Sequence, residues 1–279
     1  MRIAIIAAGE MGAGVGARLH RRGAEVMTSL AGRGRASAER ASRAGMKPID
    51  DDKALVTASD MVLSILPPSE AEALARRLAP ALTAEKGRVL YADCNAVAPE
   101  TVRRVAKIIA ATGSAFVDVG IIGGPPRDDG YTPRFYASGE AVGALRALNE
   151  FGLDVRPVEG GIGAASALKM AYASLTKGFT AIGMASARGA ANGGVAAALR
   201  AELAESQPQL FAWLQRQMPT VYPKAYRWVG EMEEIARHLG DDPGATMFQG
   251  AAKTYDGVAR IWAESGEAGL RFLSHVFRK

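Results

Sequence analysis

The sequence predicts a doubly wound α/β domain with a mostly parallel sheet at residues 1–161, followed by an all-helical domain at residues 162–279. Strand-like and helix-like segments alternate as far as about residue 119, which is the pattern of a parallel sheet covered by helices. After Gly163 a helical period takes over, and no strand signal of comparable strength follows. A length of 279 residues also suits two modest domains better than one core.

The predicted elements follow from apolar runs and from the residues that end them. Strands are expected at residues 2–7, 24–29, 46–49, 60–66, 88–93, 115–119, 134–138 and 154–158. Helices are expected at 10–22, 37–45, from Ser69, from Pro99, at 140–151, and at about 163–190 with further helices after it. Ser69 and Glu72 have the spacing of a capping box, and Pro99 suits the first position of a helix.

The composition limits the kinds of partner that are expected. The net charge is +5 and the pI about 9.4, but lysine and arginine are scattered and form no basic tract with interleaved aromatic residues. This distribution argues against nucleic-acid binding and gives mild help to an anionic ligand such as a phosphate or a carboxylate. No run is long and apolar enough to predict a membrane span.

Cysteine and histidine predict a reduced protein without a metal. Cys94 is the single cysteine, so no disulfide can form within the chain, and a cytoplasmic location is expected. Cys94 is expected to be a small buried residue at the end of a strand, with a nucleophile as the alternative. His20, His238 and His275 lie on predicted helices and have no metal-site spacing.

A glycine turn after the first predicted strand carries the clearest functional signal. Residues 7–12 read Ala-Ala-Gly-Glu-Met-Gly, at a strand-to-helix turn that could accept the pyrophosphate of a dinucleotide. Gly9 would let the backbone approach the phosphates, and Gly12 would let the helix pack closely on the strand. Ala7 replaces the first glycine of the full fingerprint, and a tight turn without a ligand is the alternative. The cofactor-binding residues expected here are Ala8, Gly9, Glu10, Met11 and Gly12.

The residues after the second predicted strand favour NADP over NAD. An acidic residue about 20 positions after the turn would hold the ribose 2′-hydroxyl of NAD. Ser29 stands there instead, and the following loop contains Arg33 and Arg35. A hydroxyl and two guanidinium groups suit a 2′-phosphate, because a guanidinium pairs with phosphate through several hydrogen bonds. Two solvated loop arginines are the alternative.

Several segments resemble the β-hydroxyacid dehydrogenase superfamily, which includes 6-phosphogluconate and 3-hydroxyisobutyrate dehydrogenases. The segments are "IIAAGEMGAGVGARLHRRGAEV" (5–26), "LSILPP" (63–68), "DCNAVAPE" (93–100), "DVGIIGG" (118–124) and "GAASALK" (163–169). The later segment "KAYRWVGEMEEIARHLG" (224–240) is similar to a poorly characterised branch whose NAD-binding domain is 6-phosphogluconate-dehydrogenase-like. The resemblance implies a Rossmann domain, a nicotinamide cofactor, and a dimer or a higher homo-oligomer.

The same resemblance implies a set of site residues. Leu66 and Pro67 match the loop along the cofactor ribose, and Asn95 takes the place of a serine beside the nicotinamide. Lys169 stands at the position of the catalytic lysine of the family. The implied substrate-binding residues are Asn95, Ile122, Gly123, Gly124, Lys169, Tyr172 and Ala173.

Elementary chemistry is consistent with this role for Lys169. Oxidation of an alcohol removes a hydroxyl proton while a hydride leaves for nicotinamide, and the reverse reaction needs a proton donor. A lysine near a cleft, with its pKa lowered by burial, can serve in both directions. Lys177, about 80° further round the same predicted helix, is expected to be solvated, with a place in the pocket as the alternative.

The sequence departs from the family pattern at positions that would face the substrate. Ala173 stands where the family has an asparagine, while Gly120 and Ile122 replace a proline and a serine of the substrate loop. These changes make the pocket less polar, so 6-phosphogluconate is not the expected substrate, and decarboxylation is disfavoured. A bulkier or more apolar carbonyl or alcohol becomes plausible. Imine reduction, known in the superfamily, and a nucleotide-binding sensor without turnover are the alternatives.

Overall fold

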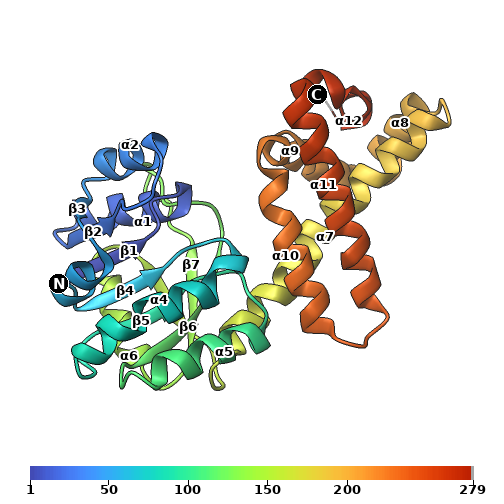
Figure 1. Ribbon diagram of the computed structural model, residues 1–279. Coiled ribbons are helices and arrows are strands. Elements are labelled where there is room, and N and C mark those ends of the chain that lie inside the picture. The colour runs from blue at the N-terminus through green and yellow to red at the C-terminus, as the bar shows by residue number, and fades with distance from the viewer. Residues whose placement is uncertain (278–279) are drawn as a thin grey trace. The chain divides into compact units, whose positions relative to one another are not determined.

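The computed structural model describes residues 1–277, and Figure 1 shows their arrangement. The chain divides into two compact units, Met1–Met170 and Ala171–Lys279, and the division falls inside the long helix α7 (Ala164–Asn192). The first unit contains the sheet, and the second contains only helices. The boundary expected from the sequence, at 161/162, stays a prediction about where the cofactor domain ends.

The first unit is built on one eight-stranded sheet with the order β3-β2-β1-β4-β5-β6-β7-β8. All neighbouring strands run parallel except β6 and β7, which are antiparallel. The doubly wound fold expected from the sequence is therefore confirmed. The strands are β1 (Arg2–Ile6), β2 (Glu25–Ser29), β3 (Lys47–Ile49), β4 (Met61–Ser64), β5 (Leu90–Asp93), β6 (Phe116–Ile122), β7 (Arg134–Ser138) and β8 (Asp154–Pro157).

Helices cover both faces of this sheet and bury a separate apolar core on each. Val15 and Leu19 of α1 pack with Ile3 and Ile5 on one face, whereas Leu74 and Leu78 of α4 pack with the opposite face. Alternate residues of β1 serve the two cores, as expected for a strand buried on both sides. The helices are α1 (Glu10–Arg21), α2 (Arg35–Arg43), α3 (Asp52–Ala58), α4 (Ala71–Ala84), α5 (Pro99–Ala110) and α6 (Val142–Leu145), with short 3₁₀ turns at Pro68–Glu70 and Arg146–Asn149.

Several local predictions differ from the structure, among them the helix expected at 140–151, which consists of α6 and the 3₁₀ turn Arg146–Asn149. No capping box begins α4, because a 3₁₀ turn at Pro68–Glu70 precedes it and no side chain caps its first turn. Helix α3 was not expected, although Asp51 caps it by accepting a hydrogen bond from Ala54 N at 2.8 Å. Strand β6 continues to Ile122, three residues further than expected, because its carboxyl end pairs with β7. Pro99 does begin α5.

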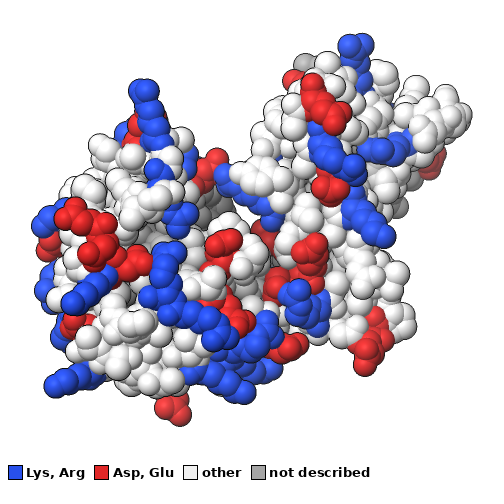
Figure 2. Space-filling model, in the orientation of Figure 1, with Lys and Arg blue, Asp and Glu red and all other residues white. Residues whose placement is uncertain are grey.

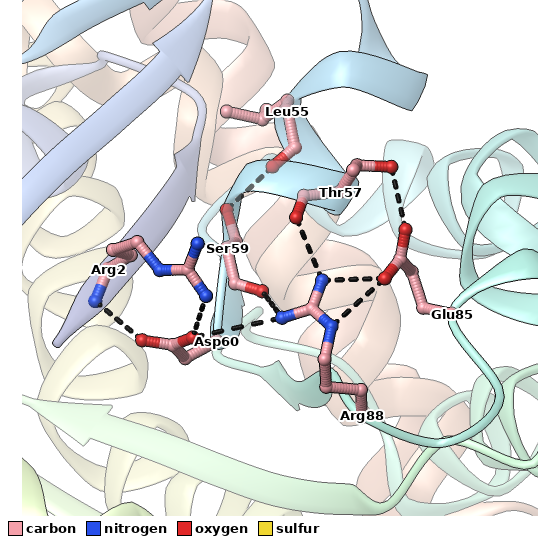
Figure 3. Close-up of polar contacts among 7 residues, drawn as sticks. All are labelled: Arg2, Leu55, Thr57, Ser59, Asp60, Glu85 and Arg88. Carbon is pink, nitrogen blue, oxygen red and sulfur yellow. Dashed lines mark hydrogen bonds and ion pairs between the residues drawn. The ribbon is translucent and has the colours of Figure 1, made fainter.

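An ion-pair network joins the amino ends of β1, β4 and β5 (Figure 3). Asp60, just before β4, accepts hydrogen bonds from the backbone and the guanidinium of Arg2, and this arginine lowers the pKa of the Asp60 carboxyl. Arg88, before β5, donates to the Thr57 and Ser59 carbonyl oxygens at 2.8 and 2.7 Å and to Glu85 at 2.6 Å. The amino ends of these strands are thus occupied by structural contacts. The loops at the carboxyl ends of the strands are not part of this network and are available for function.

The second unit packs its helices around a core of aromatic and aliphatic side chains. After α7 come α8 (Ala196–Ser206), α9 (Pro208–Val221), a 3₁₀ turn (Tyr222–Lys224), α10 (Ala225–Leu239), α11 (Gly244–Gly269) and α12 (Arg271–Phe277). Helices α10 and α11 pack against each other. Tyr222, Val221 and Tyr255 are among the buried side chains.

The expectation that Lys177 is solvated was wrong. Its side chain is 13% exposed, pairs with Glu231, and holds its ammonium 4.7 Å from the ring centre of Trp228. Tyr255 donates to the Lys177 carbonyl oxygen at 2.7 Å and packs edge-on against Trp228. A buried lysine charge requires such partners, so Lys177 serves the helical core.

Charge is mixed over the surface of both units. Figure 2 shows Lys and Arg interspersed with Asp and Glu over the face in view. None of the helices within residues 1–277 combines the length and the apolar character that a bilayer crossing requires.

Candidate functional site

The glycine turn lies at the carboxyl end of β1, beside the point where the strand order reverses. From β1 the chain winds one way to β2 and β3 and then returns to β4 on the other side of β1. Ligands of open α/β sheets bind outside the carboxyl ends of the strands at such a point. The Ala7 N–H donates to the Ile65 carbonyl oxygen at 3.3 Å, so the loops after β1 and β4 meet there.

Two glycines let the chain turn tightly between β1 and α1. A Cβ atom on Gly12 would overlap the Ala7 carbonyl oxygen and lie 3.3 Å from the Ile5 side chain, so only glycine lets α1 begin this close to β1. Gly9 caps α1 in an extended conformation without a side-chain bond, and a Cβ there would meet nothing within 4 Å. The N–H groups of a first helical turn have no acceptor within the helix, so they can bind phosphate oxygens. The residues present therefore fit a dinucleotide.

The residues expected to hold a 2′-phosphate differ in how they are placed. Ser29 ends β2, and its hydroxyl accepts a hydrogen bond from Ala31 N at 3.4 Å. Arg33 is exposed in the loop before α2. Arg35 begins α2, is 92% exposed, and pairs with Glu39 at 2.7 Å. Binding through Arg35 would thus require its ion pair to rearrange.

Asn95 links the loops after β4 and β5. Its side-chain nitrogen donates to the Ser64 hydroxyl at 2.8 Å, and its oxygen accepts from Leu66 N at 2.6 Å. Asn95 is only 3% exposed. Pro67, which follows Leu66 in the chain, is exposed. The geometry shows Asn95 positioning the Leu66–Pro67 loop, and its contact with nicotinamide or substrate stays a prediction.

A row of buried polar residues crosses four neighbouring strands, level with the carboxyl ends of β4 and β5 and with the amino half of β6. Ser64, Asp93, Asp118 and Ser138 are register partners on β4, β5, β6 and β7, and each is at most 1% exposed. Cross-strand partners on one face lie close enough to interact. The row therefore places two carboxyl groups side by side inside the sheet.

Asp118 uses its place in this row to hold the start of α7. One of its carboxylate oxygens accepts from the Ser138 hydroxyl, Gly163 N and Ser166 N at 3.0, 2.9 and 3.1 Å. The other accepts from the Ser166 hydroxyl at 2.7 Å. Ser138 also accepts from Ala165 N at 3.0 Å. These bonds satisfy N–H groups of the first turn of α7 and place a negative charge at its positive end.

Lys169 lies one turn further along this anchored helix and next to β6. A Cβ atom on Gly120 would lie 2.7 Å from the Ala165 carbonyl oxygen and 3.0 Å from Lys169 Cβ. Gly120, where the family has proline, thus lets α7 approach the strand closely. Lys169 is half-buried. Its Cβ atom lies next to Gly120, in the carboxyl half of β6, and the glycine turn lies at the same end of the sheet.

Asp93 is the second carboxyl group of the polar row and has a different environment. One oxygen accepts from Asn95 N at 3.0 Å, and the other is buried without a hydrogen-bond partner among the described residues. Burial, and secondarily the charge of Asp118, raises the pKa of Asp93 to about 7. The Asp93 carboxyl is thus partly protonated at neutral pH.

The loop after β6 is held against α1. Arg18, 8% exposed, donates to the carbonyl oxygens of Arg127 and Tyr131 at 2.9 and 3.1 Å, and Arg21 pairs with Asp128. The Tyr131 hydroxyl accepts from Gly124 N at 3.1 Å. The loop after β6 is therefore held by Arg18 and Arg21 against the helix that begins at the glycine turn.

The remaining predicted substrate residues fall into two groups. Ile122 is buried at the end of β6, whereas Gly123 and Gly124 are exposed just after it. Tyr172 and Ala173 belong to the second unit, where Tyr172 is 48% exposed and Ala173 is 1% exposed. Their roles stay predictions.

Comparison with known families decides the class of this chain. A family model described as the NAD binding domain of 6-phosphogluconate dehydrogenase matches residues 2–142. The chain belongs to this family. A second model, described as a domain of unknown function (DUF1932), matches residues 190–258 within the helical unit.

Individual relatives agree with this membership. An uncharacterised 28.5 kDa protein in the 7S RNA 5′ region of Methanothermus fervidus is 32% identical over 182 residues, covering 65% of this chain and 68% of that protein. The structure of a conserved protein of unknown function, described as similar to 3-hydroxyacid dehydrogenases, is 28% identical, with a TM-score of 0.68 over 94% of this chain and 98% of that chain.

Two further structures share the fold alone. The 3-hydroxyisobutyrate dehydrogenase of Mycobacterium tuberculosis is 17% identical, with a TM-score of 0.64 over 99% of this chain and 97% of its own. An imine reductase from Myxococcus stipitatus in complex with NADP⁺ is also 17% identical, with a TM-score of 0.55 over the whole of both chains. Both reaction classes thus occur on this architecture.

The residues that organise the site of this NAD-binding unit are not predicted from the sequence. Asp118 enters the prediction only as the first residue of the segment 118–124, and Ser138, Ser166 and Arg18 do not enter it. The signal available for Asp118 was a charged residue inside an otherwise apolar strand, which must find partners.

No group of three or more His, Cys, Asp or Glu side chains within residues 1–277 is arranged to hold a metal ion. Burial raises the pKa of the Cys94 thiol, which disfavours its use as a nucleophile.

Proposed function

We propose that this protein is an NADP-dependent oxidoreductase that transfers a hydride between nicotinamide and a CH–OH/C=O substrate, with Lys169 as general acid and base. The observation that carries the proposal is the joint placement of the glycine turn and Lys169. Both lie at the carboxyl edge of one sheet, and a buried carboxylate anchors the helix of Lys169. Membership of the NAD-binding family supports the cofactor class.

The roles of the residues follow from their positions. Bound nicotinamide supplies the hydride acceptor or donor. In oxidation, the substrate carbon loses a hydride, and the hydroxyl proton passes to Lys169 Nζ. In reduction, Lys169 Nζ returns that proton to the carbonyl oxygen. Gly9 and Gly12 admit the phosphates at α1, while Asn95 keeps the Leu66–Pro67 loop in place. The buried Ile122 favours a substrate with apolar character.

The cofactor preference can be measured without knowing the substrate. We expect calorimetric titration to give a dissociation constant for NADP⁺ at least about 10-fold lower than for NAD⁺, because a guanidinium–phosphate pair adds charge-assisted hydrogen bonds. Comparable constants for the two cofactors would contradict NADP preference.

A panel of hydroxy acids, ketones and cyclic imines would then separate alcohol oxidation from imine reduction. Cofactor binding without turnover across the panel would favour a sensor.

We propose a homodimer formed through one face of α7. Tyr172, Leu175, Phe179 and Ile182 are 48%, 62%, 47% and 52% exposed and follow the 3–4–3 spacing of a coiled-coil seam. Phe179→Glu is expected to shift the mass measured by light scattering from dimer to monomer. Tyr226→Glu, at a 60% exposed position on α10, is the matched control and should leave the mass unchanged. A monomeric native chain would disprove the dimer.

A cytoplasmic location is proposed because the single cysteine fits a reducing compartment.

A further inference from the structure

Arg40 is an arginine of α2 that reaches the glycine turn. Its Nε donates to the Ala8 carbonyl oxygen at 2.9 Å, and one of its terminal nitrogens donates to the Ser37 hydroxyl at 3.1 Å. The side chain is half-buried. Helix α2 therefore holds a guanidinium group against the residue that directly precedes Gly9.

This position lies on the path that a bound dinucleotide would follow. Strands β1 and β2 are parallel neighbours, so the glycine turn and Ser29 lie at the same edge of the sheet. A dinucleotide in this fold rests its pyrophosphate on the turn and its adenine ribose at the end of the second strand. Arg40 contacts the turn and belongs to the helix that follows β2, so its guanidinium lies between the two ends of this path.

The chemistry of Arg40 suits a phosphate. A guanidinium has five N–H donors, and the bonds of Arg40 to Ala8 and Ser37 use two of them, both on neutral oxygens. Three donors and the positive charge remain available for an anion. Arg35, by contrast, is 92% exposed and paired with Glu39. Arg40 is already fixed by Ala8, so it would lose less side-chain entropy than Arg35 on binding.

We propose that Arg40 is a phosphate-binding residue of the cofactor site and that it contacts the 2′-phosphate of NADP. The inference rests on the proposed NADP dependence and extends it to a residue outside the loop after β2. The bond to Ala8 orients the guanidinium. Ser37 lies one turn earlier on the same helix and accepts from Arg40, and Ser29 ends the preceding strand β2.

Calorimetric titration of Arg40→Met tests the proposal with four probes: NADP⁺, NAD⁺, 2′,5′-ADP and 5′-AMP. We expect the dissociation constants of NADP⁺ and 2′,5′-ADP to rise about 10- to 100-fold, the range for losing hydrogen bonds to a charged group. Those of NAD⁺ and 5′-AMP should change by less than about 3-fold. Arg40→Lys keeps a charge and should restore part of the discrimination. Arg43→Met, on the same helix but exposed, is the matched control and should bind all four probes as the native protein does.

The outcomes separate this inference from the proposed function. If the native protein prefers NAD⁺, NADP dependence is wrong whatever Arg40 does. If the native protein prefers NADP⁺ and Arg40→Met binds all four probes unchanged, only the Arg40 inference is overturned. An equal loss for all four probes also overturns it, because Arg40 would then brace the turn or contact the pyrophosphate. Thermal unfolding of each variant confirms that the domain is folded during the titrations.

Discussion

Lys169→Ala is expected to lower turnover about 10²- to 10⁴-fold on any substrate that the native protein reduces or oxidises, the range for loss of a general acid or base. The dissociation constant for NADP⁺ should stay within about 3-fold, because the glycine turn and Arg40 do not depend on this side chain. The measurement is the initial rate of NADPH consumption at saturating cofactor. An effect on turnover that leaves cofactor binding intact would place Lys169 at the chemical step.

Two variants control for this result. Lys169→Arg keeps the charge, but a guanidinium does not release a proton in this pH range, so it should not rescue the rate. Lys177→Met changes a lysine on the same helix that pairs with Glu231, so it should reduce stability without a selective loss of turnover. Near-normal turnover in Lys169→Ala would remove the lysine from the mechanism.

Asp118→Ala is expected to lower the free energy of unfolding by about 3 kcal/mol or more. The change removes four hydrogen bonds to a buried carboxylate and leaves their donors without this acceptor. At about 2–4 °C per kcal/mol, the midpoint of thermal unfolding should fall by about 6–12 °C. Differential scanning calorimetry would measure this shift. Because α7 begins at these bonds, Lys169 should also lose its defined position.

The neighbouring carboxyl group provides a matched comparison. Asp118→Asn and Asp93→Asn make the same change at register partners, but only Asp118 has both oxygens hydrogen-bonded. The pKa of Asp93 is raised from 3.8 to about 7 in the folded protein, so its favourable contribution is complete below about pH 4 and is lost as the pH rises through 7. Asp93→Asn should therefore reduce the fall in stability between pH 5 and pH 8. Asp118→Asn should destabilise the protein at both pH values, and equal effects of the two changes would contradict this account.

The fold could be predicted because its signals are local. Apolar strands alternate with helices, Pro99 marks the start of a helix, and the family segments lie in the expected order. The short helix α3 escaped detection because its capping aspartate is one of three consecutive aspartates that read as a loop.

The organisation of the site could not be predicted because it depends on contacts between distant parts of the sequence. Asp118 bonds to residues 20, 45 and 48 positions further on, and Arg40 reaches back 32 positions to Ala8. The apolar strand around Asp118 indicates that this residue needs partners, but nothing in the sequence says which residues they are, and Arg40 has no such signal. Lys177 was mistaken for such a residue because its partners lie on other helices.

The contact between Arg18 and the loop after β6 has a consequence for engineering this scaffold. A single side chain of α1 holds the Arg127 and Tyr131 carbonyl oxygens and also the Gly152 carbonyl oxygen at 3.3 Å. Grafting a foreign loop between β6 and β7 would leave this buried guanidinium without two of its three carbonyl acceptors, since only Gly152 lies outside that loop. A graft should therefore be designed together with position 18, since Arg18 joins the loop to α1.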